Sequence, residues 1–245
     1  MVQLIDNDNS ASLYERGYSR VVRLVQDTLV RRKVNRRLGT ASKREPDLEL
    51  TQQLEELGLK PERLWWGPMT LFPWKAQALI EAVEKLQPRN VIEVGSGTST
   101  ALFGALAKKF DFNFLSLENH PGTVDYVRGL VEGCDFAGNI NIQLCDFVKR
   151  EATNGRSYYW YDARFEESEQ FDLVFVDGPM GRLVGRNGAI PALYPHLSPD
   201  FRLYLDDAQR EHEAACIRQW QSLYPELVHE PVNGDPGLGV IYRGS

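Results

Sequence analysis

The segment that decides the fold runs from Asn90 to Thr100 and reads Asn-Val-Ile-Glu-Val-Gly-Ser-Gly-Thr-Ser-Thr. It opens with a short β-branched run, which predicts a buried strand. Gly95 and Gly97 then predict a tight turn, and the apolar residues 101–107 predict a helix that begins directly after it. Such a turn lets a ligand approach bare backbone, and the N–H groups of the helix point into the same space. The segment therefore predicts a nucleotide-type ligand site.

The glycine pattern of this segment narrows the choice of ligand. A dinucleotide-binding fingerprint would have a third glycine at the position of Thr100, and the phosphate-binding pattern Gly-x-x-x-x-Gly-Lys-Ser/Thr is also absent. Glu93 stands two positions before the first glycine. A carboxylate there suits a cationic ligand group, whereas a pyrophosphate site would avoid it. The structural alternative is an ordinary turn between a strand and a helix of an α/β core.

The next two predicted strands also end in acidic residues. The run 112–117 is followed by Glu118, which stands about 20 residues after Gly97, where a ribose-binding carboxylate falls in doubly wound folds. Glu118 could also cap a helix that begins near Pro121, and the two roles are compatible. The run 139–144 ends in Cys145 and Asp146.

Together these features resemble the class I S-adenosylmethionine-dependent methyltransferases, from about Phe72 to Tyr242. The resemblance implies that the glycine loop lies against the methionine part of the cofactor S-adenosylmethionine and that Glu118 binds its ribose. It also implies that Asp146 faces the adenine with Phe147 beside it, although core packing is the simpler interpretation of Phe147 alone. The implied cofactor-binding residues are Glu93, Gly95, Ser96, Gly97, Thr98, Ser99, Glu118, Asp146 and Phe147.

The resemblance and the strand pattern predict a doubly wound α/β fold. Further strand runs at 171–176, 201–205, 227–232 and 238–242 complete a mostly parallel, seven-stranded sheet with a terminal antiparallel hairpin. We expect a Rossmann-like methyltransferase domain over residues 61–245. Residues 1–60 are expected to form a basic helical N-terminal extension.

Asp177 follows the fourth predicted strand and is the candidate general base for methyl transfer. His196 and His212 are weaker candidates. The catechol-type members of the family would hold a divalent cation between Asp177, Asp206 and Asp207, but they have an amide where Asp207 stands. We therefore expect no metal and keep a divalent cation as the less favoured version. The pair Asp206-Asp207 could instead cap a helix.

The segment 180–188 combines three glycines with Arg182 and Arg186. The two arginines either hold an anionic substrate or neutralise nearby carboxylates, and Asp206 is a further candidate for substrate contact. The insert 149–170 contains Tyr158-Tyr159-Trp160-Tyr161. We expect a hairpin with exposed aromatic side chains, which covers the substrate or contacts a second subunit.

Composition and charge limit the location and the partners. The chain has 245 residues, and no apolar run approaches the roughly 20 residues of a membrane span. The polar first residues give no secretory signal, and three cysteines without a Cys-x-x-Cys pattern indicate reduced thiols. These features predict a cytoplasmic protein.

Residues 1–44 carry a net charge of +6 from ten Lys or Arg and four Asp or Glu, whereas the whole chain carries −6. The capping pair Ser12 and Glu15 and the apolar spacing that follows predict a helix in this segment. The helix could dock on its own domain, join two subunits of a homodimer or bind an anionic membrane surface. The acidic remainder of the chain argues against a nucleic-acid partner.

The function that we expect is methyl transfer from S-adenosylmethionine to a small-molecule or saccharide-like acceptor, at oxygen. Two alternatives stay open. An NAD-type nucleotide-dependent enzyme on the same sheet is disfavoured by the missing third glycine. A non-catalytic binding protein with the methyltransferase fold is disfavoured by the acids Glu93, Glu118 and Asp146, which such a scaffold has no need to keep.

Overall fold

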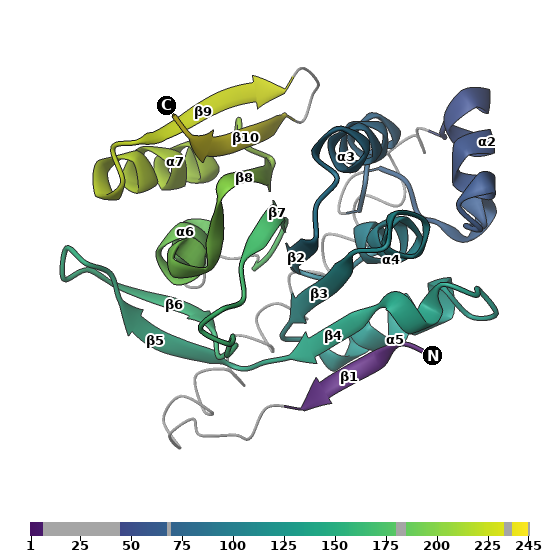
Figure 1. The fold of residues 1–245 in the computed structure, drawn as a ribbon, viewed down its shortest axis with the longest axis horizontal. Helices are drawn as coiled ribbons and strands as arrows, with labels where there is room; N and C mark the ends of the chain where they lie inside the picture. The colour runs from purple at the N-terminus through teal and green to yellow at the C-terminus, as the bar shows by residue number, and fades with distance from the viewer. Residues whose placement is uncertain (7–44, 68–69, 180–184, 233–236, 245) are drawn as a thin grey trace.

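An eight-stranded, mostly parallel sheet forms the centre of the molecule (Figure 1). The computed structural model describes residues 1–6, 45–67, 70–179, 185–232 and 237–244. Across the sheet the strands follow the order β1-β4-β3-β2-β7-β8-β10-β9; β10 pairs antiparallel with both β8 and β9, and the other described pairings of this sheet are parallel. The bounds are β1 Gln3–Asp6, β2 Asn90–Val94, β3 Asn113–Glu118, β4 Asn141–Leu144, β7 Phe171–Val176, β8 Leu197–Asp206, β9 Leu227–Val232 and β10 Leu238–Arg243.

The seven strands and the terminal antiparallel pair that the sequence predicts are confirmed. β1 is an eighth strand, which pairs in parallel with β4 at the edge of the sheet. The sequence pattern does not predict it, because a strand of four residues is too short for alternation to show.

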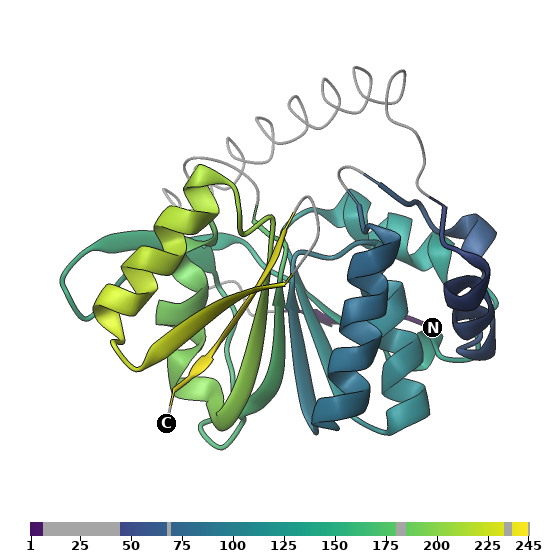
Figure 2. The ribbon, with the colours of Figure 1, turned by 90° about the horizontal axis from the view of Figure 1, so that it is seen from above.

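Helices cover both faces of the sheet (Figures 1 and 2). Leu173 and Phe175 of β7 pack into a core on one face, and Val174 and Val176 pack into a core on the other. Burial on both faces explains why the strand runs are mostly apolar and do not alternate between apolar and polar residues. One face carries α2 (Leu48–Glu56), α3 (Pro73–Leu86), α4 (Thr98–Phe110) and α5 (Pro121–Leu130); the other carries α6 (Ala189–Leu193) and α7 (Glu211–Leu223). The short 3₁₀ helices are η1 (Pro61–Arg63), η2 (Ala137–Asn139), η3 (Arg186–Gly188) and η4 (Tyr194–His196).

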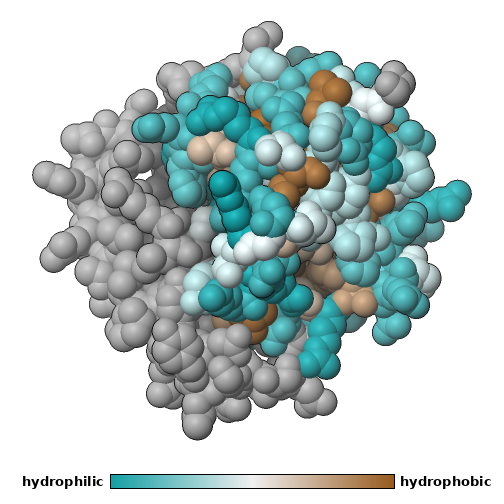
Figure 3. Space-filling view, turned by 90° about the vertical axis from the view of Figure 1, so that its left-hand side faces the viewer, coloured by the Kyte–Doolittle hydropathy of each residue, from teal (hydrophilic) through white to brown (hydrophobic). Residues whose placement is uncertain are grey.

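The insert after β4 forms a separate hairpin of β5 (Phe147–Glu151) and β6 (Ser157–Tyr161), as predicted. The expectation of exposed aromatic side chains is wrong for most of them. Trp160 and Tyr161 are each 1% exposed, because the hairpin packs closely on η3, where a Cβ on Gly188 would lie 2.7 Å from the Trp160 ring. The described surface on this side of the molecule is mainly hydrophilic, with hydrophobic residues scattered over it (Figure 3).

The basic helix expected between Ser12 and Arg37 lies outside the described residues. The described parts of the segment 1–60 are β1 and α2, and α2 begins where the Asp47 side chain accepts a hydrogen bond from the Leu50 N–H at 2.9 Å. Among the helices of the described residues, none combines the length and the apolarity that a bilayer crossing requires.

Candidate cofactor and active site

The loops that follow β2 and β7 touch each other at the point where the strand order reverses. In open α/β sheets this is where ligands bind. The Val94 carbonyl oxygen accepts hydrogen bonds from the N–H groups of Asp177 at 3.0 Å and Gly178 at 2.6 Å. Gly95 has φ +91°, and a Cβ on it would lie 2.7 Å from the Gly178 nitrogen. This backbone contact places Asp177 directly beside the glycine loop.

Glu93 braces the glycine loop from beneath. Its side chain is fully buried, and its Oε2 accepts hydrogen bonds from the Thr100 hydroxyl at 2.6 Å and the Ser116 hydroxyl at 2.7 Å. The Thr100 hydroxyl in turn accepts the Gly97 N–H at 2.8 Å. The other oxygen, Oε1, is buried and accepts no hydrogen bond within normal distance from the described part of the chain. Glu93 therefore lies under the loop, and not on its open side.

Glu118 ties the same loop to the end of β3. One carboxylate oxygen accepts the Ser96 N–H at 3.0 Å, and the other accepts the N–H groups of Asn119 at 2.7 Å and His120 at 2.8 Å. The cap of α5 is His120, without a side-chain hydrogen bond, so Glu118 does not act as the cap of that helix. Only 5% of Glu118 is exposed. The hydrogen bond to Ser96 thus fixes the Glu118 side chain and the glycine loop relative to each other.

Two buried acids, Glu93 and Glu118, flank the glycine loop and make it anionic when they are ionised. A pyrophosphate in this loop would lie close to both buried acids, and the repulsion is poorly screened away from water. A cationic group is attracted by the same arrangement. A Cβ on Gly97 would meet none of the described residues within 4 Å, so the described part of the chain leaves open space above the loop for a ligand. Thr98 and Ser99 are buried in the first turn of α4, where the Thr98 hydroxyl lies 3.3 Å from the Trp65 carbonyl oxygen.

Asp146 and Phe147, the two residues expected at the adenine, lie in different surroundings. Asp146 is half-buried between β4 and β5, at the same edge of the sheet as the glycine loop, and its carbonyl oxygen accepts the Asp162 N–H at 2.8 Å. Phe147 is fully buried, and its ring lies 4.9 Å from that of Tyr161. Phe147 therefore has the position of a core residue in this structure.

Burial raises the pKa of Glu93 from its ordinary value of 4.5 to about 7, and the Glu118 charge adds to the rise, while the hydroxyls of Ser99, Thr100 and Ser116 oppose it. Between pH 4.5 and about pH 7, Glu93 is therefore protonated in the folded protein and ionised in the unfolded chain. The free energy of unfolding should therefore fall as the pH rises through this window, by at most about 1.4 kcal/mol per pH unit.

A Glu93→Gln variant keeps the shape of the side chain without the proton exchange. We expect its free energy of unfolding to depend less on pH than that of the wild type between about pH 5 and pH 7. Urea unfolding of both proteins across this range measures the difference. Curves that run parallel would contradict the raised pKa of Glu93.

Three acids gather at the ends of β7 and β8. Asp177, Asp206 and Asp207 each offer a carboxylate oxygen, and these atoms all lie within 4.8 Å of one another. The Lys75 ammonium forms an ion pair with Asp206 and lies 3.8 Å from Asp207 Oδ1. The Arg186 guanidinium lies 2.8 Å from Asp177 Oδ1. The acid cluster therefore encloses two cationic side chains.

From the sequence, Arg186 could either hold an anionic substrate or neutralise nearby carboxylates, and its surroundings in the structure favour the second role. Its side chain is only 3% exposed, and its guanidinium donates hydrogen bonds to the carbonyl oxygens of Asp177 and Asp206. Glu213 of α7 lies 3.9 Å away on its other side. Arg186 thus neutralises carboxylates and does not reach out to solvent. Arg182 lies outside the described residues.

The strand-end acids do not cap α7. That helix begins at Glu211 with Arg210 as its cap, without a side-chain hydrogen bond. Burial and the neighbouring Asp206 raise the pKa of Asp177 above its ordinary value, and Arg186 opposes the rise. The Asp177 side chain nonetheless keeps 34% of its surface exposed, whereas Asp206 is 6% exposed. Of the three acids, Asp177 is the one that a ligand can reach.

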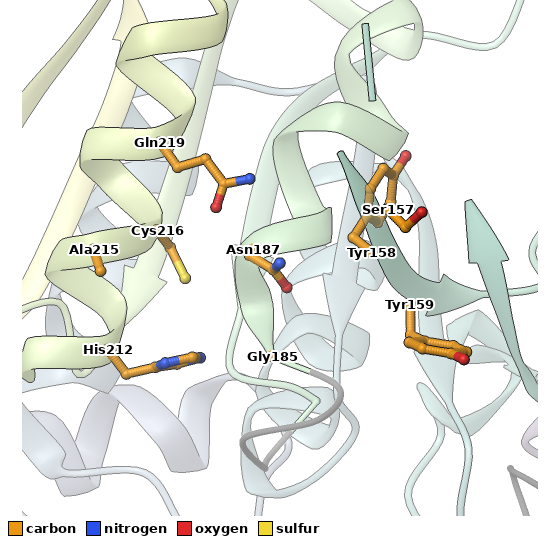
Figure 4. Close-up of a pocket in the computed structure, with 9 residues that line it drawn as sticks. All are labelled: Ser157, Tyr158, Tyr159, Gly185, Asn187, His212, Ala215, Cys216 and Gln219. Carbon is orange, nitrogen blue, oxygen red and sulfur yellow. The ribbon is translucent and has the colours of Figure 1, made fainter. Parts of the chain in front are cut away.

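A cavity of about 310 Å³ lies between β6, η3 and α7 (Figure 4). Residues of α7 line one side, those of β6 line the other, and Asn187 stands between them. Gly185 and Asn187, which line the cavity, flank Arg186 in the chain. His212 lines the cavity, whereas the His196 ring lies 5.1 Å from that of Phe165. The lining residues are Ser157, Tyr158, Tyr159, Gly185, Asn187, His212, Ala215, Cys216 and Gln219.

Lys75 is the site residue that the sequence analysis missed. It lies in the first turn of α3, three residues after the cap Phe72, and only 1% of it is exposed. Cations are unfavourable at the positive end of a helix dipole. A lysine there, with no acid in the first turn, is the signal that could have drawn attention to it.

Comparison with solved structures shows the fold of class I S-adenosylmethionine-dependent methyltransferases. The O-methyltransferase TomG from Streptomyces achromogenes, in complex with S-adenosylmethionine, is similar over 87% of this chain and 96% of its own, with 12% identity and a TM-score of 0.51. A putative caffeoyl-CoA O-methyltransferase from Staphylococcus aureus is similar over 90% of this chain and all of its own, with 13% identity and a TM-score of 0.52. The S-adenosylhomocysteine-bound methyltransferase PaMTH1 from Podospora anserina is similar over 90% and 96%, with 11% identity and a TM-score of 0.50. No protein-family model and no curated protein sequence matches the chain.

Proposed function

We propose that the protein transfers a methyl group from S-adenosylmethionine to a hydroxyl group of a small molecule. The observation that carries this proposal is the pair of buried carboxylates, Glu93 and Glu118, under the glycine loop. A sulfonium and an ammonium group suit a loop that is flanked by two acids, whereas the pyrophosphate of NAD does not. The fold supports the proposal, since TomG and PaMTH1 were crystallised with S-adenosylmethionine and S-adenosylhomocysteine, respectively.

We assign Asp177 as the residue that receives the proton of the acceptor hydroxyl. When bound, the cofactor supplies a methyl group on a sulfonium, so that in-line attack by the acceptor oxygen forms the C–O bond as the C–S bond breaks. The protein's task is then to align the acceptor and to receive its proton. Asp177 lies beside the glycine loop and keeps an exposed carboxylate. Its raised pKa makes it a better proton acceptor than an ordinary aspartate once it is ionised.

We place the acceptor in the cavity between β6, η3 and α7. Hydroxyl, amide and imidazole groups line it, which suits a hydroxyl-bearing acceptor of phenolic or saccharide type. The net charge of −6 supports a small molecule over a nucleic acid as the acceptor. Membrane or homodimer contact through the basic segment 7–44 stays a proposal that rests on the sequence.

Replacing Glu118 with alanine should weaken the binding of S-adenosylhomocysteine by roughly tenfold or more, since a buried carboxylate with three hydrogen bonds is lost from the loop. Isothermal titration calorimetry measures the affinity. Glu55→Ala, an exposed acid of α2, changes the net charge equally and should bind as the wild type does. If the wild type gives no heat with S-adenosylhomocysteine or S-adenosylmethionine, the proposed function is wrong.

Replacing Asp177 with asparagine should leave cofactor binding intact and lower the rate of methyl transfer by roughly 10²-fold or more, because the proton acceptor is lost. The rate can be followed with labelled S-adenosylmethionine and a panel of phenolic and saccharide acceptors. Asp200→Asn, an exposed residue of β8, is the matched control. Unchanged turnover in Asp177→Asn would remove this residue from the role of base.

A further inference from the structure

The acid cluster at the ends of β7 and β8 has the ligand chemistry of a divalent-cation site. Asp177, Asp206 and Asp207 present carboxylate oxygens within 4.8 Å of one another, and all-oxygen ligand sets suit Mg²⁺ and Mn²⁺. The catechol-type methyltransferases that the chain resembles hold a metal with acids at these strand ends. The question is whether this cluster has room for such an ion.

The carboxylates of the cluster are already engaged by cationic side chains. Asp206 is paired with Lys75 and Asp177 with Arg186. Asp207 Oδ2 lies 2.6 Å from the Arg210 guanidinium. A metal ion that bonded to these oxygens would stand a few ångströms from an ammonium and a guanidinium group. In a buried cluster such repulsion between like charges is weakly screened. While the Lys75 ammonium lies against Asp206 and Asp207, these two residues do not fit a metal ion.

Aromatic rings and carboxylates both lie close to the Lys75 ammonium. Its Nζ lies 5.4 Å from the centre of the Phe72 ring and 5.6 Å from that of the Trp74 ring, and it also pairs with Asp206 and Asp207. Both rings come from the start of α3, so the helix that precedes β2 inserts the ammonium group into the end of β8. Aromatic faces and carboxylates are both favourable surroundings for a cation. The arrangement is a binding site for a cation that the chain supplies itself.

We propose that the Lys75 ammonium takes the place of the divalent cation, so that the wild-type protein binds no metal at this cluster and an uncharged residue at position 75 opens a Mg²⁺ or Mn²⁺ site there. The proposal concerns the charge balance of Asp206, Asp207 and Lys75. It stands independently of methyl transfer, and its test needs neither cofactor nor acceptor.

The test is a titration with Mn²⁺, followed by electron paramagnetic resonance of the free ion. We expect no bound Mn²⁺ in the wild type and one bound ion per chain in Lys75→Met. A second substitution, Asp206→Asn, should abolish the binding that Lys75→Met creates. Lys75→Arg keeps the positive charge and should bind no Mn²⁺, which separates the effect of charge from that of a changed side chain.

A second readout covers the case in which Lys75→Met folds poorly. Mn²⁺ should then raise the Tm of Lys75→Met, or of the more polar Lys75→Gln, and leave that of the wild type unchanged, because a ligand stabilises only the state that binds it. One Mn²⁺ bound to the wild type and lost in Asp206→Asn would overturn the proposal. Folded Lys75→Met and Lys75→Gln that both bind no Mn²⁺ would overturn it as well. Calorimetry with S-adenosylhomocysteine tests the proposed function separately.

Discussion

Replacing Arg186 with methionine should lower the free energy of unfolding by about 3–5 kcal/mol at neutral pH, the usual cost of breaking a buried ion pair from one side. The methionine would fill much of the space, but it could not pair with Asp177 or donate to the carbonyl oxygens of Asp177 and Asp206. Glu213 would lose a neighbouring cation as well. Urea unfolding measures the loss.

The loss should shrink at acidic pH. Without Arg186 the pKa values of the nearby carboxylates rise further, so the folded variant takes up protons that the unfolded chain still lacks. The variant therefore regains stability relative to the wild type as the pH falls. Arg210→Met is the matched control: Arg210 also pairs with an acid of the cluster, but its side chain is 53% exposed, and we expect a loss of about 0–1 kcal/mol. Equal losses in the two variants would show that burial of Arg186 does not matter.

Replacing Gly95 with alanine should cost about 1–3 kcal/mol of stability and abolish binding of S-adenosylhomocysteine. The positive φ of Gly95 is unfavourable for alanine. The added Cβ would also press on the backbone of Gly178, which cannot move aside as a flexible side chain would. The displacement should reach Asp177, since both its N–H and that of Gly178 are bonded to Val94.

Gly97→Ala separates binding from folding in the same loop. The backbone of Gly97 is extended, and the Cβ would contact none of the described residues, so we expect a stability change within about 0.5 kcal/mol. The new methyl group would occupy the space that we assign to the ligand. Binding of S-adenosylhomocysteine should therefore weaken while the urea midpoint stays in place. A variant that binds as tightly as the wild type would show that the ligand does not lie above Gly97.

The course of the sheet could be predicted because each core strand carries its own signal. Runs such as Val91–Val94 and Phe171–Val176 are mostly apolar, with Glu93 and Asp172 as the exceptions, and turn or acidic residues mark their ends. The order of elements along the chain then leaves few topologies. The edge strand β1 carries no comparable signal, since it has four residues and gains its hydrogen bonds from β4, far away in sequence.

The sequence predicts which residues stand at the strand ends of the candidate site, but not which hydrogen bonds and ion pairs join them. That Glu118 and Asp177 stand at strand ends follows from the sequence, because the carboxyl ends of parallel strands meet at one edge. That Glu118 holds the Ser96 N–H, or that Lys75 reaches Asp206, depends on how loops and helices pack, which no local pattern records. The same holds for the hairpin of β5 and β6. Its aromatic residues can be read from the sequence, but their burial against η3 cannot.

The edge strand β1 sets an order for assembly of the sheet. Gln3 pairs with Asn141 and Asp6 with Leu144, so β1 can pair only after the distant segment that forms β4 has been synthesised. Closing so long a loop costs conformational entropy, and the four-residue strand makes few contacts to offset that cost. We therefore expect this pairing to form late in folding. Backbone amides of β1 should accordingly exchange with solvent sooner than those of β2. The edge of the sheet is thus completed by a strand whose partner lies far away in sequence.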